Sequence, residues 1–159
     1  MRRCVALILL TIVTAAGCSS THAPNPVKPT AQNCPSSITP RTLPTWARAG
    51  FHPPTLPMPY VMSDRGDIVA ILWADRNPLH APPLAKVNNK ILWVSKVVSG
   101  PFTPLHIRAA LDGTNQAVTR EVAGGPGPSI IDLPAAGCWS LNLSWSGHQD
   151  HLSLRYAPS

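Results

Sequence analysis

The chain of 159 residues is hydrophobic at 44% of its positions and charged at only 13%, with 19 prolines, 10 glycines and a formal net charge of +6. The hydrophobic content excludes wholesale disorder, and the prolines exclude a helical bundle, because each internal proline removes a helix hydrogen bond. The length suits one domain, and the remaining fold classes are all-β and loop-rich.

The first eighteen residues have the pattern of an export signal. Arg2 and Arg3 precede an apolar run of 12 residues, Val5 to Ala16, whereas a membrane-spanning helix needs about 20. The run ends in Ala15-Ala16-Gly17-Cys18, which resembles the lipobox of bacterial prolipoproteins, with Ala15 where that family usually has leucine. An ordinary secretory signal cut near Ala16 is the alternative.

The lipobox resemblance implies a processed and lipidated protein. Residues 1–17 would be removed as a lipoprotein signal peptide, and Cys18 would carry the covalent lipid, the one cofactor-like group that we expect. Two or three acyl chains suffice for stable membrane attachment. The resemblance therefore predicts an extracytoplasmic protein that is lipid-anchored to the bacterial cell membrane, without distinguishing an inner from an outer membrane.

A tether and a lead-in follow the lipidated cysteine. Residues 18–45 are rich in Ser, Thr, Pro, Asn and Ala and have no apolar periodicity, which predicts an extended tether. Residues 46–159 form the predicted domain, which begins with a proline-rich stretch. That stretch contains Trp46, Phe51, Met58 and Tyr60, and these apolar side chains predict a nonhelical lead-in that packs on the domain.

Beyond Ser63, apolar segments alternate with clusters of Gly, Pro, Asn and Asp. The pattern predicts seven strands: Asp67 to Ala74, Lys90 to Val98, Leu105 to Leu111, Ala117 to Val122, Ser129 to Leu133, Cys138 to Trp145 and His151 to Tyr156. Seven short strands separated by turns are typical of a sandwich. We predict an immunoglobulin-like antiparallel β-sandwich, with a closed β-barrel as the alternative.

The last two predicted strands carry the clearest alternation. Trp139, Leu141, Leu143 and Trp145 share one face, as do Leu152, Leu154 and Tyr156, which predicts one buried face for each strand. The connection Ser146 to Asp150 is short enough only for an antiparallel hairpin. By contrast, Ile68 to Trp73 is apolar on both faces, which indicates a central strand or one that the lead-in also covers.

The segment GCWSLNLSWSG, residues 137–147, resembles the secreted β-sandwich domains found in lipoproteins of Gram-positive and actinobacterial type. The resemblance covers the C-terminal half of the chain and carries no functional motif, so it implies no activity. True immunoglobulin domains place a cysteine on each of two facing strands. Here Cys138 is out of phase with the buried Trp139, and Cys34 precedes every predicted strand, so we expect sandwich layering without that family's own disulfide.

The four cysteines leave two for a bridge. Cys4 leaves with the signal and Cys18 is lipidated, so Cys34 and Cys138 remain in a compartment that permits disulfides. They have one possible intramolecular pairing. Free thiols or a metal site are the alternatives, although the sequence has no C-x-x-C spacing.

The one dense polar cluster is Gly147-His148-Gln149-Asp150-His151. His148, Asp150 and His151 could bind zinc or copper, with His106 or His80 as a further ligand. A polar hairpin turn without a metal is the alternative. The five tryptophans could suit a sugar-binding platform, but Trp139 and Trp145 are in phase with core leucines.

Other functions find less support in the sequence. From Trp46 onward there are 9 basic and 7 acidic residues, a net charge of +2 without a Lys/Arg cluster, so we expect no nucleic-acid partner. The sequence has no G-x-S-x-G motif and no paired carboxylates, so we expect no enzyme. The leading hypothesis is a membrane-anchored lipoprotein that displays a noncatalytic binding or structural domain to another envelope protein or a small ligand. The alternatives are a metal-binding or small-ligand-binding protein and an envelope hydrolase.

Loops are the expected recognition surfaces of this domain, because loops on a rigid scaffold commonly carry binding residues. The candidates are Asn77 to Pro83 with Asn88-Asn89, and the glycine-rich and proline-rich run Gly124 to Pro128.

Overall fold

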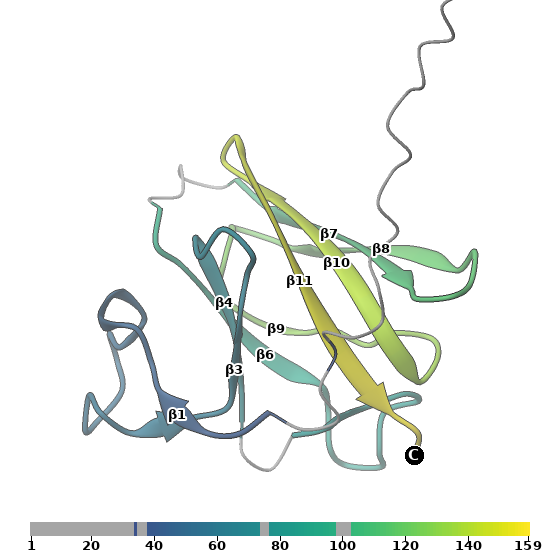
Figure 1. Ribbon diagram of the computed structural model, residues 1–159, viewed down its shortest axis with the longest axis horizontal. Helices are drawn as coiled ribbons and strands as arrows, with labels where there is room; N and C mark the ends of the chain where they lie inside the picture. The colour runs from purple at the N-terminus through teal and green to yellow at the C-terminus, as the bar shows by residue number, and fades with distance from the viewer. Residues whose placement is uncertain (1–33, 35–37, 74–76, 98–102) are drawn as a thin grey trace, which may run out of the picture.

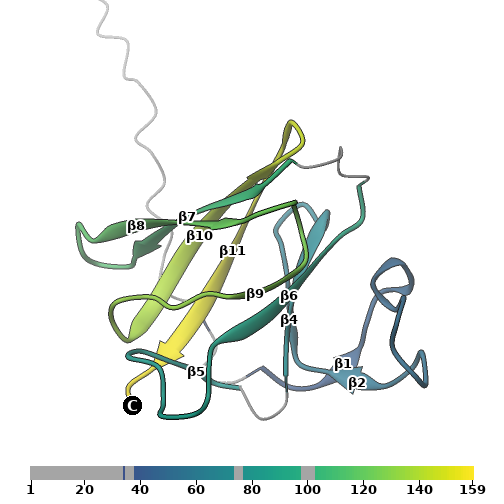
Figure 2. The same cartoon turned by 180° about the vertical axis from the view of Figure 1, so that it is seen from behind.

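Two β-sheets pack face to face in the computed structural model, with a small two-stranded ribbon beside them (Figures 1 and 2). The structure describes residues 34, 38–73, 77–97 and 103–159. The predicted all-β sandwich with antiparallel sheets is confirmed, while the immunoglobulin-like subclass stays a prediction. The signal peptide, Cys18 and most of the predicted tether lie outside the described residues. In the described part, no helix is long and apolar enough to cross a membrane.

The larger sheet has five strands in the order β5-β11-β10-β7-β8. Their bounds are β5 Leu79–His80, β7 Leu105–Leu111, β8 Ala117–Val122, β10 Gly137–Trp145 and β11 His148–Ala157. Neighbours are antiparallel except at one edge, where the short β5 runs parallel to the end of β11. The strand β10 therefore lies at the centre of the sheet, between β11 and β7.

The smaller sheet has four antiparallel strands in the order β3-β4-β6-β9. Their bounds are β3 Tyr60–Met62, β4 Ile68–Leu72, β6 Lys90–Ser95 and β9 Pro128–Ile130. The prediction placed the strand that became β9 at Ser129 to Leu133. It is wrong at the C-terminal end, because Ile131 and Leu133 leave the ladder and turn their side chains into the core.

The two longest strands, β10 and β11, form a hairpin with a two-residue turn. Trp145 pairs with His148, so the turn consists of Ser146 and Gly147, whose φ angles are 44° and 78°. Positive φ at both central residues is the mark of a type I′ turn, whose twist matches that of the flanking strands. The predicted connection Ser146 to Asp150 is therefore too long, and β11 begins at His148 rather than at His151.

The main core lies between the two sheets and confirms the predicted alternation. Trp139, Leu141, Leu143 and Trp145 are at most 2% exposed, as are Leu152, Leu154 and Tyr156. Trp93 of β6 reaches the same core from the opposite sheet. Burial of each large apolar side chain contributes about 1.5–3 kcal/mol. Burial also raises the pKa of Tyr156, and its neutral hydroxyl donates to the carbonyl of Ile131 at 2.6 Å.

A second apolar cluster lies on the outer face of the four-stranded sheet, where the lead-in covers β4. The lead-in contains β1 Arg41–Thr42, a 3₁₀ turn Thr45–Ala47 and β2 Pro57–Met58, which pairs with β1. Leu43, Ala47 and Met58 pack there against Val69 and Ile71. The strand β4, which is apolar on both faces, was predicted to be central or to be covered by the lead-in. Both predictions are confirmed, since β4 lies between β3 and β6 and the lead-in packs on its outer face.

The packed region begins earlier than the predicted boundary at Trp46. Leu43 is 1% exposed, and Arg48 fixes the segment by donating from Nε to the Leu43 carbonyl at 2.7 Å. The side-chain amide of Asn77 also donates a hydrogen bond to the Ile38 carbonyl at 2.7 Å. The lead-in is nonhelical, as predicted, apart from the single 3₁₀ turn.

The predicted disulfide between Cys34 and Cys138 is present, with 5.8 Å between the Cα atoms. Cys138 lies on the same outer face of β10 as Ser140, so the bridge is separate from the apolar cluster between the sheets, although both cysteines are buried. Arg155, opposite Cys138 on β11, donates from Nε to the Cys34 carbonyl at 3.2 Å. Closing a loop of 104 residues contributes about 4–5 kcal/mol in the chain-entropy model.

Candidate functional site

The outer face of the five-stranded sheet is polar, because the apolar alternate residues of its strands point into the core. The outward residues are His106 and Arg108 on β7, Thr119 on β8, Asn142 and Ser144 on β10, and Gln149 on β11. The register sets them in rows: Ser144 lies between His106 and Gln149, and Asn142 lies between Arg108 and His151. This face therefore presents hydrogen-bonding groups from four adjacent strands.

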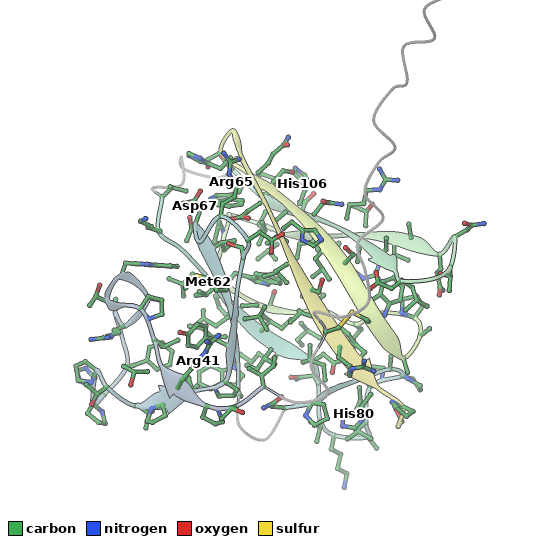
Figure 3. The ribbon with its side chains drawn as sticks, in the orientation of Figure 1. Arg41, Met62, Arg65, Asp67, His80 and His106 are labelled. Carbon is green, nitrogen blue, oxygen red and sulfur yellow. A yellow bond between two sulfur atoms is a disulfide. The ribbon has the colours of Figure 1, made fainter. Side chains whose placement is uncertain are left out.

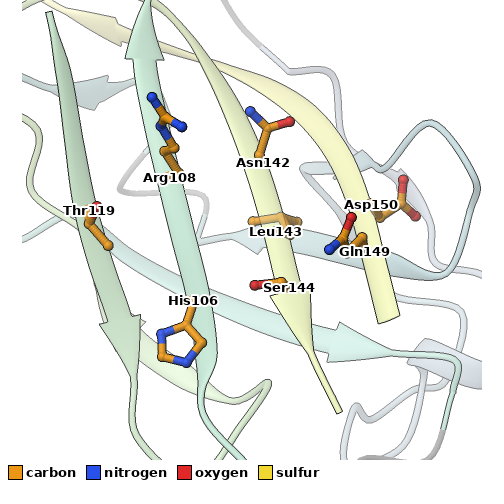
Figure 4. A pocket seen from close by; sticks show the side chains of 8 residues that line it. All are labelled: His106, Arg108, Thr119, Asn142, Leu143, Ser144, Gln149 and Asp150. Carbon is orange, nitrogen blue, oxygen red and sulfur yellow. The ribbon is translucent and has the colours of Figure 1, made fainter. Parts of the chain in front are cut away.

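Those outward side chains line an open groove of about 300 Å³ (Figure 4). A second hollow of about 220 Å³ shares His106, Ser144 and Gln149 with it and continues to His148 at the β10–β11 turn. Together the two hollows run along the turn end of β7, β10 and β11. We call them the outer groove.

Arg108 is the free charge of the outer groove. No hydrogen bond or ion pair connects its guanidinium to any residue that the structure describes. His106 faces Glu121 across the β7–β8 pair, with Nδ1 3.4 Å from Oε2. Asp150 borders the groove, but its carboxylate points away from the other lining side chains (Figure 4). Arg108 therefore offers five donors to solvent, and no carboxylate of the described residues forms an ion pair with it.

The Asp150 carboxylate fastens the β3–β4 turn, residues 63–67, to β11. It accepts from the Ser63 hydroxyl at 2.6 Å and from the backbone amides of Arg65, Asp67 and His151 at 3.0, 3.3 and 2.8 Å. Burial opposes ionisation, but these hydrogen bonds outweigh it and lower the pKa of Asp150 below the ordinary value of 3.8. Asp150 is a structural carboxylate, 7% exposed, rather than a ligand facing solvent.

His151 bridges two other polar residues on the outer face. Its Nε2 lies 2.7 Å from the Ser140 hydroxyl, and its Nδ1 lies 2.9 Å from Oδ2 of Asp64 in the β3–β4 turn. The side chain of His151 is 27% exposed and that of Asp64 is 71% exposed. Both ring nitrogens of His151 are thus already engaged.

The structure does not bring the predicted metal ligands together. Alternation along β11 puts Asp150 on the inner face and His151 on the outer face, while His148 lies at the turn, 5.8 Å from the Trp145 ring. His80 and His106, the candidate further ligands, lie at opposite ends of the molecule (Figure 3). Among the described residues, no group of three His, Cys, Asp or Glu side chains could hold a metal ion. Metal binding stays a prediction without a geometric site to support it.

The predicted recognition loop at Asn77 to Pro83 is largely packed rather than exposed. Leu79 and Ala81 are buried, and β5 adds to the sheet edge. Asn89, 3% exposed, accepts from the His80 amide and donates to the His80 carbonyl and to Asp132. The exposed-loop prediction is wrong for Leu79, Ala81 and Asn89, because a buried asparagine provides partners for the backbone of this loop, and it is confirmed for Pro82, Pro83 and Asn88.

The tryptophans do not form a sugar-binding platform. Trp93, Trp139 and Trp145 are in the main core, and Trp46 and Trp73 pack against the second cluster. A further hollow of about 380 Å³ lies beside β9, next to Lys90 and Ile130. Its one charged group, the Lys90 ammonium, stands over the Trp73 ring at 5.5 Å. The outer groove therefore has the richer set of convergent polar groups.

Sequence reasoning missed the outer groove and the contacts of His151. The signal was present in the alternation of β7 and β10, which placed His106, Arg108, Asn142 and Ser144 on solvent faces. The sequence did not show the register of the four strands, which decides which of these side chains lie next to one another. Comparison with protein-family models, with curated proteins and with solved structures finds no match to this chain.

Proposed function

We propose that this protein is a membrane-anchored envelope lipoprotein whose sandwich domain binds a compact anionic ligand in the outer groove. The observation that carries the binding function is Arg108, a guanidinium without an ion-pair partner among the described residues, in an open groove that also presents neutral hydrogen-bonding groups. The lipid anchor rests on the lipobox resemblance at Cys18. The disulfide between Cys34 and Cys138 supports an oxidising compartment outside the cytoplasm.

The chemistry of the outer groove favours a carboxylate or phosphate on a small polar molecule. Arginine pairs with such anions through two parallel hydrogen bonds. Asn142 and Gln149 supply amide donors and acceptors, and Ser144 and Thr119 supply hydroxyls, which suit the hydroxyl groups of a sugar. Figure 4 shows Arg108 and Asn142 side by side at one end of the groove, so one ligand group can contact both.

The anchor is tested by replacing the lipidated cysteine. Cys18→Ser should abolish palmitate labelling and release the protein from the membrane fraction, since the serine hydroxyl cannot take the thioether-linked lipid. The measurement is metabolic labelling with fractionation of intact cells. Cys4→Ser is the matched control and should change neither readout. Retention of Cys18→Ser in the membrane would overturn the anchor.

Ligand binding is tested on the mature domain by amide chemical-shift titration with D-glucuronate, D-glucose and inorganic phosphate. Glucuronate should shift the amides of Arg108, Asn142, Ser144 and Gln149, whereas glucose should not. Phosphate alone tests whether the anion suffices without the sugar ring. Arg108→Gln should weaken binding at least about tenfold, because a charge-assisted pair contributes about 1.5–3 kcal/mol.

The matched control for charge is Lys96→Gln, which removes one exposed positive charge at the end of β6. It should leave the glucuronate shifts unchanged. Equal shifts with glucose and glucuronate, or full binding by Arg108→Gln, would contradict the anion site.

A further inference from the structure

Three polar side chains from separate parts of the chain form a connected line beside the outer groove. Ser140 lies on β10, His151 on β11 and Asp64 in the β3–β4 turn, and the two contacts are 2.7 Å and 2.9 Å long. In the register, Ser140 stands opposite Ser153, and His151 stands opposite Asn142. His151 is therefore the diagonal neighbour of Ser140, a spacing that a long or aromatic side chain can bridge.

The contact with Asp64 favours one tautomer of the neutral imidazole. An ionised carboxylate can only accept, so the proton of neutral His151 resides on Nδ1 and points to Asp64. The unprotonated Nε2 then accepts the hydrogen bond of the Ser140 hydroxyl. This is the arrangement in which a histidine acts as general base toward a serine while a carboxylate orients the ring.

The His151–Asp64 contact is not needed to hold the β3–β4 turn in place. Asp150 already binds that turn through Ser63 and the amides of Arg65 and Asp67. The Asp64 amide also donates to the His151 carbonyl at 2.8 Å. The side-chain contact of Asp64 thus adds orientation of the imidazole to a turn that is already fastened.

From this geometry we infer that Ser140 is a nucleophile activated by His151, with Asp64 as the positioning residue, and that it reacts with compact acyl or phosphoryl electrophiles. Ser140 Oγ attacks the carbonyl carbon of an ester, and its proton passes to His151 Nε2. The alkoxide leaving group departs with that proton, and water then hydrolyses the acyl-serine by the same path. Ser140 is 6% exposed, which limits the substrate class to small electrophiles.

Side chains rather than backbone amides would stabilise the developing oxyanion. The strand β10 is paired on both sides, so its amides are committed to the sheet. Arg108 and Asn142 are the donors on the groove side of Ser140: Ser140 pairs with Ala110, two positions from Arg108, and Asn142 follows Ser140 on the same face. Side-chain donors of these types can serve as an oxyanion hole. The nucleophile therefore lies next to the Arg108 end of the outer groove.

The inference goes beyond ligand binding and is tested with a fluorophosphonate probe on the mature domain. Ser140 Oγ would form a bond to phosphorus, fluoride would leave, and the hydroxyl proton would pass to His151. Tryptic mass spectrometry should locate the adduct on Ser140. Ser140→Ala should give no adduct. His151→Gln should be labelled at least about 100-fold more slowly than the wild type, because a general base usually contributes at least that factor to the rate.

The role of Asp64 is separated from a purely structural role by conservative rescue. Asp64→Asn should slow labelling about tenfold, a modest effect because the carboxylate is exposed and solvent screens it. Asp64→Glu should restore most of the rate. Both variants should retain the wild-type unfolding midpoint, since Asp150 holds the turn.

The matched control is Ser153→Ala, which removes the serine directly opposite Ser140 and should leave labelling unchanged. The inference is overturned if the probe leaves Ser140 unmodified under conditions that label trypsin completely, or if His151→Gln labels at the wild-type rate. Binding of glucuronate is measured on the same variants. Loss of labelling in Ser140→Ala with retained glucuronate shifts separates this inference from the binding function.

Discussion

The two outer faces of the sandwich differ in what covers them. The outer face of the four-stranded sheet is apolar, and the lead-in closes it with Leu43, Ala47 and Met58. The outer face of the five-stranded sheet alternates instead, and its outward residues include exposed polar groups such as Arg108 and Asn142. An antiparallel sheet can leave one face in water only if that face is polar.

This difference explains why the candidate site lies where it does. The lead-in covers the apolar face over β4 with its proline-rich segment, so this part of the face is not available to a ligand. The polar face is rigid, since both of its long strands are fixed by the core, and its hydrogen-bonding groups remain available. Side chains on strands hold their geometry more closely than side chains on loops.

The largest expected loss of stability comes from a substitution under the lead-in, on the outer face of the four-stranded sheet. Leu43→Ala should lower the free energy of unfolding by about 2–4 kcal/mol, because a fully buried leucine leaves a cavity between the lead-in and β4. Chemical denaturation of the mature domain measures this change. Asn142→Ala is the counterpart on the open face and should stay within about 0.5 kcal/mol of the wild type. Similar losses for both variants would remove the distinction between the two faces.

The contact of Asp150 with the β3–β4 turn, which joins the two sheets, gives a smaller loss of stability that depends on pH. Asp150→Asn should lower the free energy of unfolding at pH 7 by about 1–3 kcal/mol, because a buried charged acceptor of several hydrogen bonds is lost. The pKa of Asp150 is lower in the folded protein than in the unfolded chain. Its stabilisation is therefore complete above about pH 5 and declines as pH falls through the ordinary value of about 3.8 toward the folded pKa.

The measurement is urea unfolding of the wild type and Asp150→Asn at pH 7, 5 and 3.5. The gap between them should be widest at pH 7 and should narrow at pH 3.5. Asp112→Asn is the control, since its side chain makes no hydrogen bond to the described residues. A gap that stays constant with pH would show that the carboxylate charge of Asp150 does not stabilise the fold.

Alternation predicted the long strands well because it is a local property. Leu105–Leu111 and Ala117–Val122 have the predicted bounds, and the buried faces of β10 and β11 are those expected from Trp139 and Leu152. The short strands β1, β2, β3 and β5 were missed. Two or three residues are too few to show a period, and β5 in addition pairs with a strand far along the chain, as where Leu79 pairs with Tyr156.

The polar contacts were harder to predict because they depend on register. A turn at Ser146 and Gly147 puts Asn142 opposite His151, and this alone makes Ser140 a diagonal neighbour of the imidazole. With the longer predicted connection, Ser146 to Asp150, the pairing of Asn142 with His151 could not be predicted. Asp64 could not be placed at all, because its position is fixed by Asp150 across 86 residues of sequence. A two-residue turn with glycine at its second position is the local signal that would have set the register.

If the N-terminal segment anchors the protein to a membrane, as we propose, the bridge between Cys34 and Cys138 has a mechanical consequence. A pull transmitted along that segment reaches Cys34 and passes through the disulfide directly into β10. Because the force bypasses residues 35–137, which lie inside the loop closed by the disulfide, it does not pull the lead-in off β4. The load falls on the central strand of the five-stranded sheet, which is held by a neighbour on each side. The face that carries the outer groove is thus the one through which force enters the domain.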